Sequence, residues 1–541
     1  MLKPKKAMVT YSTVMALVLI LSACSDEGKG NPGEGTAEKT VSNLNEKGFP
    51  IVKEPIQLTF FTGKAPTTAN NWNETALWKE YAKMTNVNVN FQLVSFETMA
   101  EKRNLALASG DYPDAFHTTR LSTVDLMKYG SQGTFVKLND LIDKYAPNLK
   151  RLMEKYPFIK QGITMPDGNI YSFPLVYEPG FDAILISNKL WIQKEWLDKL
   201  NMPEPQTLDE FYNYLKAVMG KDLNGNGKDD EIPFGGVGYL GLMDNLKGAF
   251  GLMNRGVNHK NVDVDPKTNK LRFTPADESY KQLLQFMNKL HKEGLMDKEI
   301  VTIKANQFYA KGADGVYGAT ALTWPSTLMN QNGYVVSPAL KGPNGDRIYS
   351  NIQSSLVQVG SFVLTDKNKY REASVRWIDH FYGEEGSKLF FMGIKDVSYT
   401  ESADGKIDYV DEIKKNPQGL TLEQAAVKYV TWPGGSYPGI VTPKYFKAVT
   451  EEMNKATDKL KPYMIKDIWP AFTFTNEEAD QLNVLNTDLG TYVDQMTSKF
   501  ITGEVPFSEW DTYLNTLKKM KIDDYLKVYQ AAYDRYQKAS K

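Results

Sequence analysis

The sequence predicts an α/β protein with two lobes built from discontinuous segments and a helical C-terminal region. Three observations lead to this fold class. Residues 56–109 alternate strand, helix, strand and helix, which is typical of a largely parallel sheet covered by helices. The 541-residue chain leaves roughly 490 residues after a polar N-terminal segment, enough for more than one core. Helical patterns then dominate the last part of the chain, at residues 476–500, 507–520 and 523–540.

The N-terminus predicts the compartment. Three lysines in the first nine residues precede an apolar run from Val14 to Leu21 and the tetrapeptide L-S-A-C that ends at Cys24. This predicts a signal peptide over residues 1–23, because the run is too short for a permanent membrane span. The tetrapeptide resembles a bacterial lipobox, which implies lipidation of Cys24 and an anchor on the extracellular face of the cell membrane. The alternative is an ordinary secretory signal with an incidental cysteine.

Two features of composition restrict the possibilities further. Cys24 is the only cysteine, so disulfides and zinc–cysteine sites are excluded. Residues 24–48 contain almost no apolar side chains before Leu44, which predicts a flexible tether and a folded part that starts near Phe49. The formal net charge of −1 gives no reason to expect nucleic acid as a partner.

The first expected elements follow in order. Residues 56–63 (IQLTFFTG) and 87–94 (VNVNFQLV) are β-rich runs and predict two strands. A helical pattern lies between them, a second occupies residues 96–109, and DYPDAF at residues 111–116 predicts a turn into a third strand.

The middle of the chain is more helical. Thr207 to Glu210 (TLDE) form a predicted capping box, followed by Leu208, Phe211, Leu215 and Val218 on one apolar face. Residues 278–294 predict another amphipathic helix with Gly294 as its C-cap.

Residues 222–233 (DLNGNGKDDEIP) follow the first of these helices and have the alternation of a calcium loop. Six or seven oxygens are available, which suits Ca²⁺, and Gly227 supplies the sharp bend at the sixth position. Their sources are the side chains of Asp222, Asn224, Asn226, Asp230 and Glu231 and the carbonyl of Lys228. The alternative is an Asn-Gly-rich turn without metal, but such a turn needs no carboxylate at both ends of the alternation.

The stretch from Asn188 to Gly235 resembles the signature of bacterial extracellular solute-binding proteins of carbohydrate ABC transporters, of the alginate-oligosaccharide-binding or LipO-like type. SGDYPDAF (109–116), MPDGNIYSFP (165–174), LKGPNGD (340–346) and the C-terminal stretch 499–536 are similar to family segments in the same order. The resemblance implies a two-lobed periplasmic-binding-protein-like fold (type II) with a hinge and an interlobe cleft. It also implies one structural Ca²⁺ on the six loop residues.

The implied organisation assigns residues 49–185 to the N-terminal lobe and 186–335 to the C-terminal lobe with the calcium loop. Residues 336–430 are expected to return to the N-terminal lobe, and residues 431–541 to complete the C-terminal lobe. The implied function is a lipid-anchored, non-catalytic monomer that closes on an oligosaccharide and hands it to ABC permease subunits.

Sugars present polar edges and apolar faces, so a sugar cleft needs flat aromatic rings with amides and charges around them. Aromatic residues in Asn-, Pro- and Gly-rich loops are therefore the candidates for ligand contact: Asn71, Trp72, Tyr177, Trp324, Trp432 and Tyr437. For each ring the alternative is packing in a core. Trp191, Trp196, Trp377 and Trp510 lie at helical spacing with other apolar residues and are expected in cores.

Three alternative functions remain open. A glycosidase needs two opposed carboxylates, and 65 acidic residues leave such a pair possible by number alone. No G-x-S-x-G or H-E-x-x-H motif occurs, and the four histidines have no metal-ligand spacing. An oligopeptide-binding lipoprotein would share the anchor and the lobes but not the calcium loop. A purely structural surface protein would need no lobed α/β chain.

Overall fold

The computed structural model describes residues 43–186, 188–433 and 435–539. The predicted signal peptide, Cys24 and most of the predicted tether lie outside the described residues. Asn43–Lys541 form one compact unit. The folded part begins before Phe49, because Arg376 donates hydrogen bonds to the carbonyls of Asn45 and of Gly48 (2.6 Å). The Phe49 ring packs against His380 at 5.1 Å.

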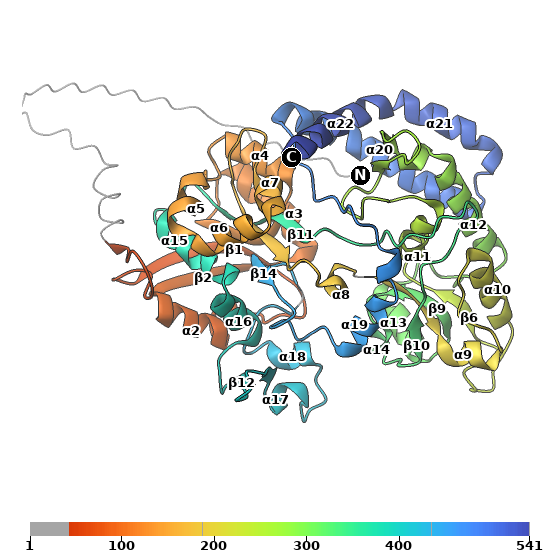
Figure 1. The fold of residues 1–541 in the computed structure, drawn as a ribbon, viewed down its shortest axis with the longest axis horizontal. Helices are drawn as coiled ribbons and strands as arrows, with labels where there is room; N and C mark the ends of the chain where they lie inside the picture. The colour runs from red at the N-terminus through yellow and green to blue at the C-terminus, as the bar shows by residue number, and fades with distance from the viewer. Residues whose placement is uncertain (1–42, 187, 434, 540–541) are drawn as a thin grey trace, which may run out of the picture. The chain divides into compact units, whose positions relative to one another are not determined.

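The first lobe is built on a sheet with the strand order β14-β4-β11-β3-β1-β2 (Figure 1). Strands β1 and β2 pair in parallel along their full lengths, and only β11 runs antiparallel to its neighbours. The expected first two strands are confirmed with one more residue each. The strands are β1 (Ile56–Lys64), β2 (Val87–Ser95), β3 (Ala115–Leu121), β4 (Phe173–Tyr177), β11 (Leu356–Leu364) and β14 (Gly439–Val441).

Helices cover this sheet and create an aromatic core in which Trp78 stacks on Trp377 at 5.4 Å. The main helices of the first lobe are η1 (Trp72–Glu74), α2 (Ala76–Thr85), α3 (Phe96–Ser109), α4 (Thr123–Ser131), α5 (Asn139–Tyr145), α6 (Pro147–Lys155), α7 (Pro157–Ile163), α15 (Arg371–Asp379), η4 (His380–Tyr382) and α16 (Glu384–Met392). A small extension contains β12 (Tyr399–Glu401), β13 (Ile407–Tyr409), α17 (Asp411–Lys414) and α18 (Leu422–Ala426).

The second lobe is built on a smaller mixed sheet with the order β10-β5-β9-β6. The predicted capping box starts α10, with the Glu210 amide donating to the Thr207 hydroxyl at 3.1 Å. The strands are β5 (Lys189–Gln193), β6 (Ile232–Gly235), β9 (Tyr317–Leu322) and β10 (Tyr334–Val336), with the ribbon β7 (Val262–Val264) and β8 (Leu271–Phe273). The helices are α9 (Lys194–Lys199), α10 (Leu208–Val218), α11 (Leu240–Leu246), η2 (Lys247–Phe250), η3 (Thr274–Ala276), α12 (Glu278–Lys292), α13 (Ala305–Ala313) and α14 (Pro325–Leu328).

The C-terminal helices pack on the second lobe beside α12 (Figure 1). Tyr280 and Thr497 share a hydrogen bond of 2.8 Å, and Asn288 donates to the carbonyls of Phe500 and Ile501 at the end of α20. The expected helical C-terminal region is therefore confirmed. Its elements are α19 (Glu451–Asp458), η5 (Lys461–Tyr463), α20 (Asn476–Thr502), η6 (Phe507–Glu509), α21 (Trp510–Lys519) and α22 (Ile522–Ala539).

Crossing segments join the lobes at places that differ from the expected boundaries. The first, residues 178–188, contains the short helix α8 (Asp182–Leu185). The chain returns to the first sheet at β11, not at residue 336, because β10 extends the second sheet. It leaves after β14, not at residue 430, because β14 pairs in parallel with β4. The sequence does not mark these points, since strand pairing between distant segments decides them.

Candidate functional site

The two sheets each present loops at the carboxyl ends of parallel strands. In the first lobe, β1, β3, β4 and β14 run in the same direction, so they end at one edge of the sheet. In the second lobe, β6 and β9 are parallel and also end together. Ligands of open α/β sheets bind at such edges, so these two edges are the candidate site.

At the edge of the first sheet, three polar side chains from distant segments form a hydrogen-bonded chain. Arg120 of β3 donates from Nε to Ser436 Oγ (3.2 Å), and Ser436 donates to Gln358 Oε1 of β11 (2.9 Å). The Arg120 guanidinium also lies 3.9 Å from the centre of the Phe96 ring. Arg120 and Ser436 both have positive φ (52° and 69°), a conformation that costs free energy and often marks functional sites.

The charge of Arg120 also acts on Tyr177, one of the predicted ligand residues. Burial raises the pKa of the Tyr177 hydroxyl to about 12, and the Arg120 charge acts in the opposite direction. Burial lowers the pKa of Arg120. Tyr177 therefore stays a neutral hydrogen-bonding group at the end of β4. The sequence gives no signal for Arg120, Ser436 or Gln358, because the three residues become neighbours only through sheet pairing.

At the edge of the second sheet lies a cavity of about 310 Å³. Its lining combines polar groups with exposed apolar ones, since Val237 and Leu240 are 48% and 51% exposed. A cavity with mixed polar and apolar lining suits the edges and faces of a sugar ring. Residues that line it include Asn188, Val237, Leu240, Asp244, Tyr309 and Thr323.

Trp324 lies two residues after the end of β9 at this edge and is partly exposed. The Lys189 ammonium lies 4.7 Å from the centre of its ring, and the Trp191 ring meets it at 5.0 Å with an interplanar angle of 66°. The indole is thus held from β5 while part of its surface remains open. Among the predicted tryptophan contacts, Trp324 offers the most surface for a ligand.

The other predicted ligand residues lie in the first lobe. Asn71 is exposed and accepts the Asn73 amide as the N-cap of η1. Trp72 is only 3% exposed and packs against Phe91 at 5.4 Å. It therefore belongs to the core in this structure, although its polar neighbours in the sequence suggested an open loop.

Trp432 and Tyr437 are also buried, at 2% and 3% exposed. Trp432 Nε1 donates to the Tyr409 hydroxyl at 3.1 Å, and Tyr437 packs against Phe391 at 5.1 Å. Tyr437 precedes β14, which pairs in parallel with β4 of the first sheet. Contact of these two rings with a ligand stays a prediction that needs them to be uncovered.

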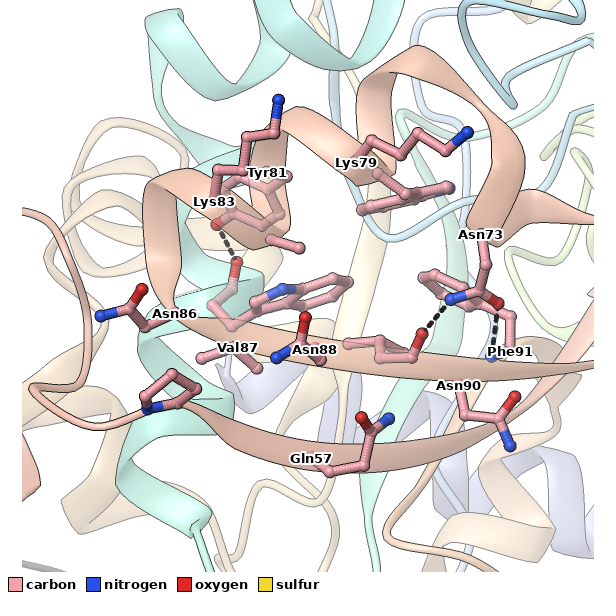
Figure 2. Close-up of a pocket in the computed structure, with 15 residues that line it drawn as sticks. Gln57, Asn73, Lys79, Tyr81, Lys83, Asn86, Val87, Asn88, Asn90 and Phe91 are labelled. Atoms are coloured by element: carbon pink, nitrogen blue, oxygen red, sulfur yellow. Dashed lines mark hydrogen bonds between the residues drawn. The ribbon is translucent and has the colours of Figure 1, made fainter.

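A separate polar cavity of about 710 Å³ lies along β2, at the opposite side of the first sheet from β14. Figure 2 shows the amides of Gln57, Asn86, Asn88 and Asn90 around it. The Asn73 amide accepts from Phe91 N (3.4 Å) and donates to the Val89 carbonyl, so it occupies part of the free strand edge. This pairing blocks an approaching strand.

The predicted calcium loop wraps its backbone around its own side chains. The Asp222 carboxylate accepts three backbone N–H groups, those of Gly225, Asn226 and Gly227, at 2.8–3.1 Å. The Asn226 amide donates to Asp230 at 3.1 Å. Gly227 has φ of 81°, the left-handed conformation that the sharp bend requires.

The Glu231 side chain lies inside the loop and links its end to its beginning. It is 7% exposed, and its Oε1 accepts the amides of Leu223 (2.6 Å) and Asn224 (2.8 Å). Its Oε2 is buried without a hydrogen-bond partner among the described residues, as is Asn224 Nδ2. A buried carboxylate oxygen with no partner is costly, and a cation would satisfy it.

The described residues contain no group of three or more His, Cys, Asp or Glu side chains that could hold a metal ion, so the carboxylates of Asp222, Asp230 and Glu231 do not converge as such a group in this structure. None of the helices in this part of the chain combines the length and apolar character needed to cross a membrane.

Comparison with known proteins gives consistent matches. A family model for bacterial extracellular solute-binding proteins matches residues 76–421. The fructooligosaccharide ABC transporter substrate-binding protein FusA of Streptococcus pneumoniae serotype 4 is 31% identical over 538 residues, with 96% of this chain and 97% of FusA covered. The polygalacturonan/rhamnogalacturonan-binding protein YtcQ of Bacillus subtilis is 24% identical, with 80% and 83% covered. The solved structure of a FusA EF-hand mutant with fructo-nystose has a TM-score of 0.76 and 29% identity, and covers 90% of this chain and 100% of the FusA chain.

Proposed function

The chain belongs to the family of bacterial extracellular solute-binding proteins, and we propose that it captures an oligosaccharide between its lobes and delivers it to an ABC importer. The observation that carries the proposal is the similarity to FusA along 96% of this chain. The described residues agree with it chemically, because the candidate edges combine aromatic rings, amides and a cavity of mixed polarity.

The protein acts as a receptor and not as an enzyme in this proposal. FusA and YtcQ are both named as binding proteins. Capture requires only that the lobes close around the sugar, with segments such as residues 178–188 absorbing the change in backbone angles. The Arg120–Ser436–Gln358 chain would hydrogen-bond the polar edges of the sugar, and Trp324 would cover an apolar face.

The proposal includes the anchor and the assembly state. Lipidated Cys24 would hold the receptor at the extracellular face of the membrane. A single chain supplies both lobes, so the receptor would act as a monomer. Its partners would be the permease subunits of the importer.

The loop from Asp222 to Glu231 would bind one Ca²⁺ through Asp222, Asn224, Asn226, Asp230, Glu231 and the Lys228 carbonyl. Support comes from the unpartnered Glu231 Oε2 inside the loop and from the oxygen-rich donor set. The loop joins α10 to β6, so the ion would stabilise this connection and not contact the sugar. Sensor EF-hands open helix pairs, whereas a single loop can only hold the chain around it.

A thermal-shift screen tests the function on the soluble chain from Ser25 onward with calcium present. The panel is fructo-nystose, oligogalacturonides, diacetylchitobiose and a peptide mixture. A ligand at a hundred times its Kd adds about 2.7 kcal/mol to the free energy of unfolding, so one oligosaccharide class should raise Tm clearly and remain uncleaved. A shift with peptides alone, or cleavage of the sugar, would contradict the proposal.

The candidate site is tested by Trp324→Ala, which should weaken binding of the active sugar at least tenfold while Tm without sugar changes little. Tyr492→Ala is the matched control, because Tyr492 is a half-buried aromatic of α20 that packs on Tyr513 outside the candidate site. If both variants bound the sugar with equal affinity, Trp324 would not be a ligand contact.

A further inference from the structure

Lys189, the first residue of β5, has an unusual environment for a lysine. Its side chain is fully buried. Among the described residues no carboxylate lies within ion-pair distance, and the ammonium donates one hydrogen bond, to the Ile186 carbonyl at 2.8 Å. Burial alone lowers its pKa to about 8. A buried charge with so few partners costs stability, which calls for a role other than stability.

The second contact of the ammonium is the Trp324 indole, 4.7 Å from Nζ to the ring centre. A cation at this distance is attracted to the face of an indole, most strongly where water is excluded. Trp191 supports the same ring from its edge and is itself held by its Nε1 donating to the Leu322 carbonyl at 2.9 Å. The orientation of Trp324 is therefore set from β5.

The first contact, Ile186, lies in the first crossing segment. This segment is hydrogen-bonded to residues 349–353, which lead from the second lobe to β11, since the Gln353 backbone N–H donates to the Leu185 carbonyl at 3.1 Å. Tyr349 and Asn351 both donate to the Asn188 carbonyl, at 3.0 and 2.9 Å. Closure of the lobes would have to bend the backbone of these segments. Because the Lys189 ammonium contacts both the Trp324 indole and the Ile186 carbonyl, it connects the ring to this backbone.

We propose that Lys189 is a positioning residue that holds Trp324 ready for the sugar and couples contact at this ring to the bending of residues 178–188. The inference rests on the proposed function, because it assumes that Trp324 contacts the ligand. A sugar stacking on the open part of the indole would press the ring toward the ammonium. The ammonium would then transmit this contact to the Ile186 carbonyl.

Lys189→Met tests the role because methionine keeps the length and removes the charge. The variant should bind the active sugar of the panel about tenfold more weakly, while Tm without sugar is unchanged or higher. A merely structural lysine would instead show a lower Tm and normal affinity in the remaining folded protein. Lys194→Met is the matched control, because Lys194 begins α9 directly after β5 and pairs with Asp198 at the surface.

A double-mutant cycle shows whether Lys189 acts through Trp324. The variant carrying both Lys189→Met and Trp324→Ala should bind no more weakly than Trp324→Ala alone. Additive losses would overturn the proposed coupling, as would normal affinity of Lys189→Met. If the wild-type chain binds no oligosaccharide of the panel, the proposed function fails, and this outcome is distinct from a failure of the coupling.

Tryptophan emission gives an independent readout. In the sugar-free protein, loss of the Lys189 proton near pH 8 should change the emission of Trp324, and the change should be absent in Lys189→Met. The surrounding tyrosines Tyr317, Tyr334 and Tyr349 have pKa values raised by burial and do not titrate there. Glu452 of α19 lines the same small cavity as this indole and is kept unchanged in all variants. A pH change that persists in Lys189→Met would contradict the assignment.

Discussion

Replacing Glu231 by glutamine separates the effect of calcium from the effect of the loop itself. Glutamine keeps the shape and an acceptor for the Leu223 and Asn224 amides. It weakens two charge-assisted hydrogen bonds but also removes a buried charge whose Oε2 has no partner. These contributions oppose each other, so without calcium we expect the variant within about 1 kcal/mol of wild type.

Calcium changes this balance. At a hundred times the Kd, Ca²⁺ adds about 2.7 kcal/mol to the free energy of unfolding of the wild type. For a chain of this size that corresponds to a rise in Tm of about 2–3 °C. Glu231→Gln lacks a buried carboxylate ligand and should lose most of this gain. The Tm values of the wild type and of Glu231→Gln should therefore differ clearly only when calcium is present.

Differential scanning calorimetry in excess EDTA and in excess CaCl₂ measures both states. Asp229→Asn is the matched control, because it changes the charge of the same loop at a residue outside the predicted ligand set. It should respond to calcium like the wild type. The reasoning is refuted if calcium raises the Tm of Glu231→Gln as much as that of the wild type, or if calcium leaves the wild type unchanged.

Two further predictions concern the core of the first lobe. Trp377→Ala should lower the free energy of unfolding by about 3–5 kcal/mol, because Trp377 is 1% exposed and packs on Trp78 and Phe60. Urea denaturation followed by circular dichroism measures this loss. A loss below about 1 kcal/mol would contradict the packing. His117→Phe should flatten the acid side of the Tm profile, because burial lowers the pKa of His117 to about 3. Its neutral form contributes stability that is present above the unfolded pKa near 6.5 and is lost as pH falls toward 3, by about 1.4 kcal/mol per pH unit. Parallel Tm profiles of the two proteins from pH 7 to pH 4 would contradict a buried neutral histidine.

Local features of the fold were predictable because they depend on neighbours along the chain. The strands at residues 56 and 87, the capping box of Thr207 and Glu210, and the C-terminal helix from Asn476 follow from hydrophobic period and cap chemistry, and the structure confirms each. The four tryptophans expected in cores are buried, although Trp191 lies in strand β5 and not on a helix: Trp191, Trp196, Trp377 and Trp510. Family membership also followed from the order of motifs along the sequence.

The composition of the candidate site depended on tertiary structure. Trp72 and Trp324 both occur in polar or proline-containing stretches of the sequence, yet Phe91 and Trp78 cover the first while the second stays partly open. The Arg120–Ser436–Gln358 chain joins residues up to 316 positions apart. Hydrophobic period and turn chemistry are local properties, so the sequence determined which elements form and where the loop bends. Which rings remain exposed, and which distant polar groups become neighbours, depends on strand pairing and on the packing of each lobe. Only the tertiary structure decides these properties.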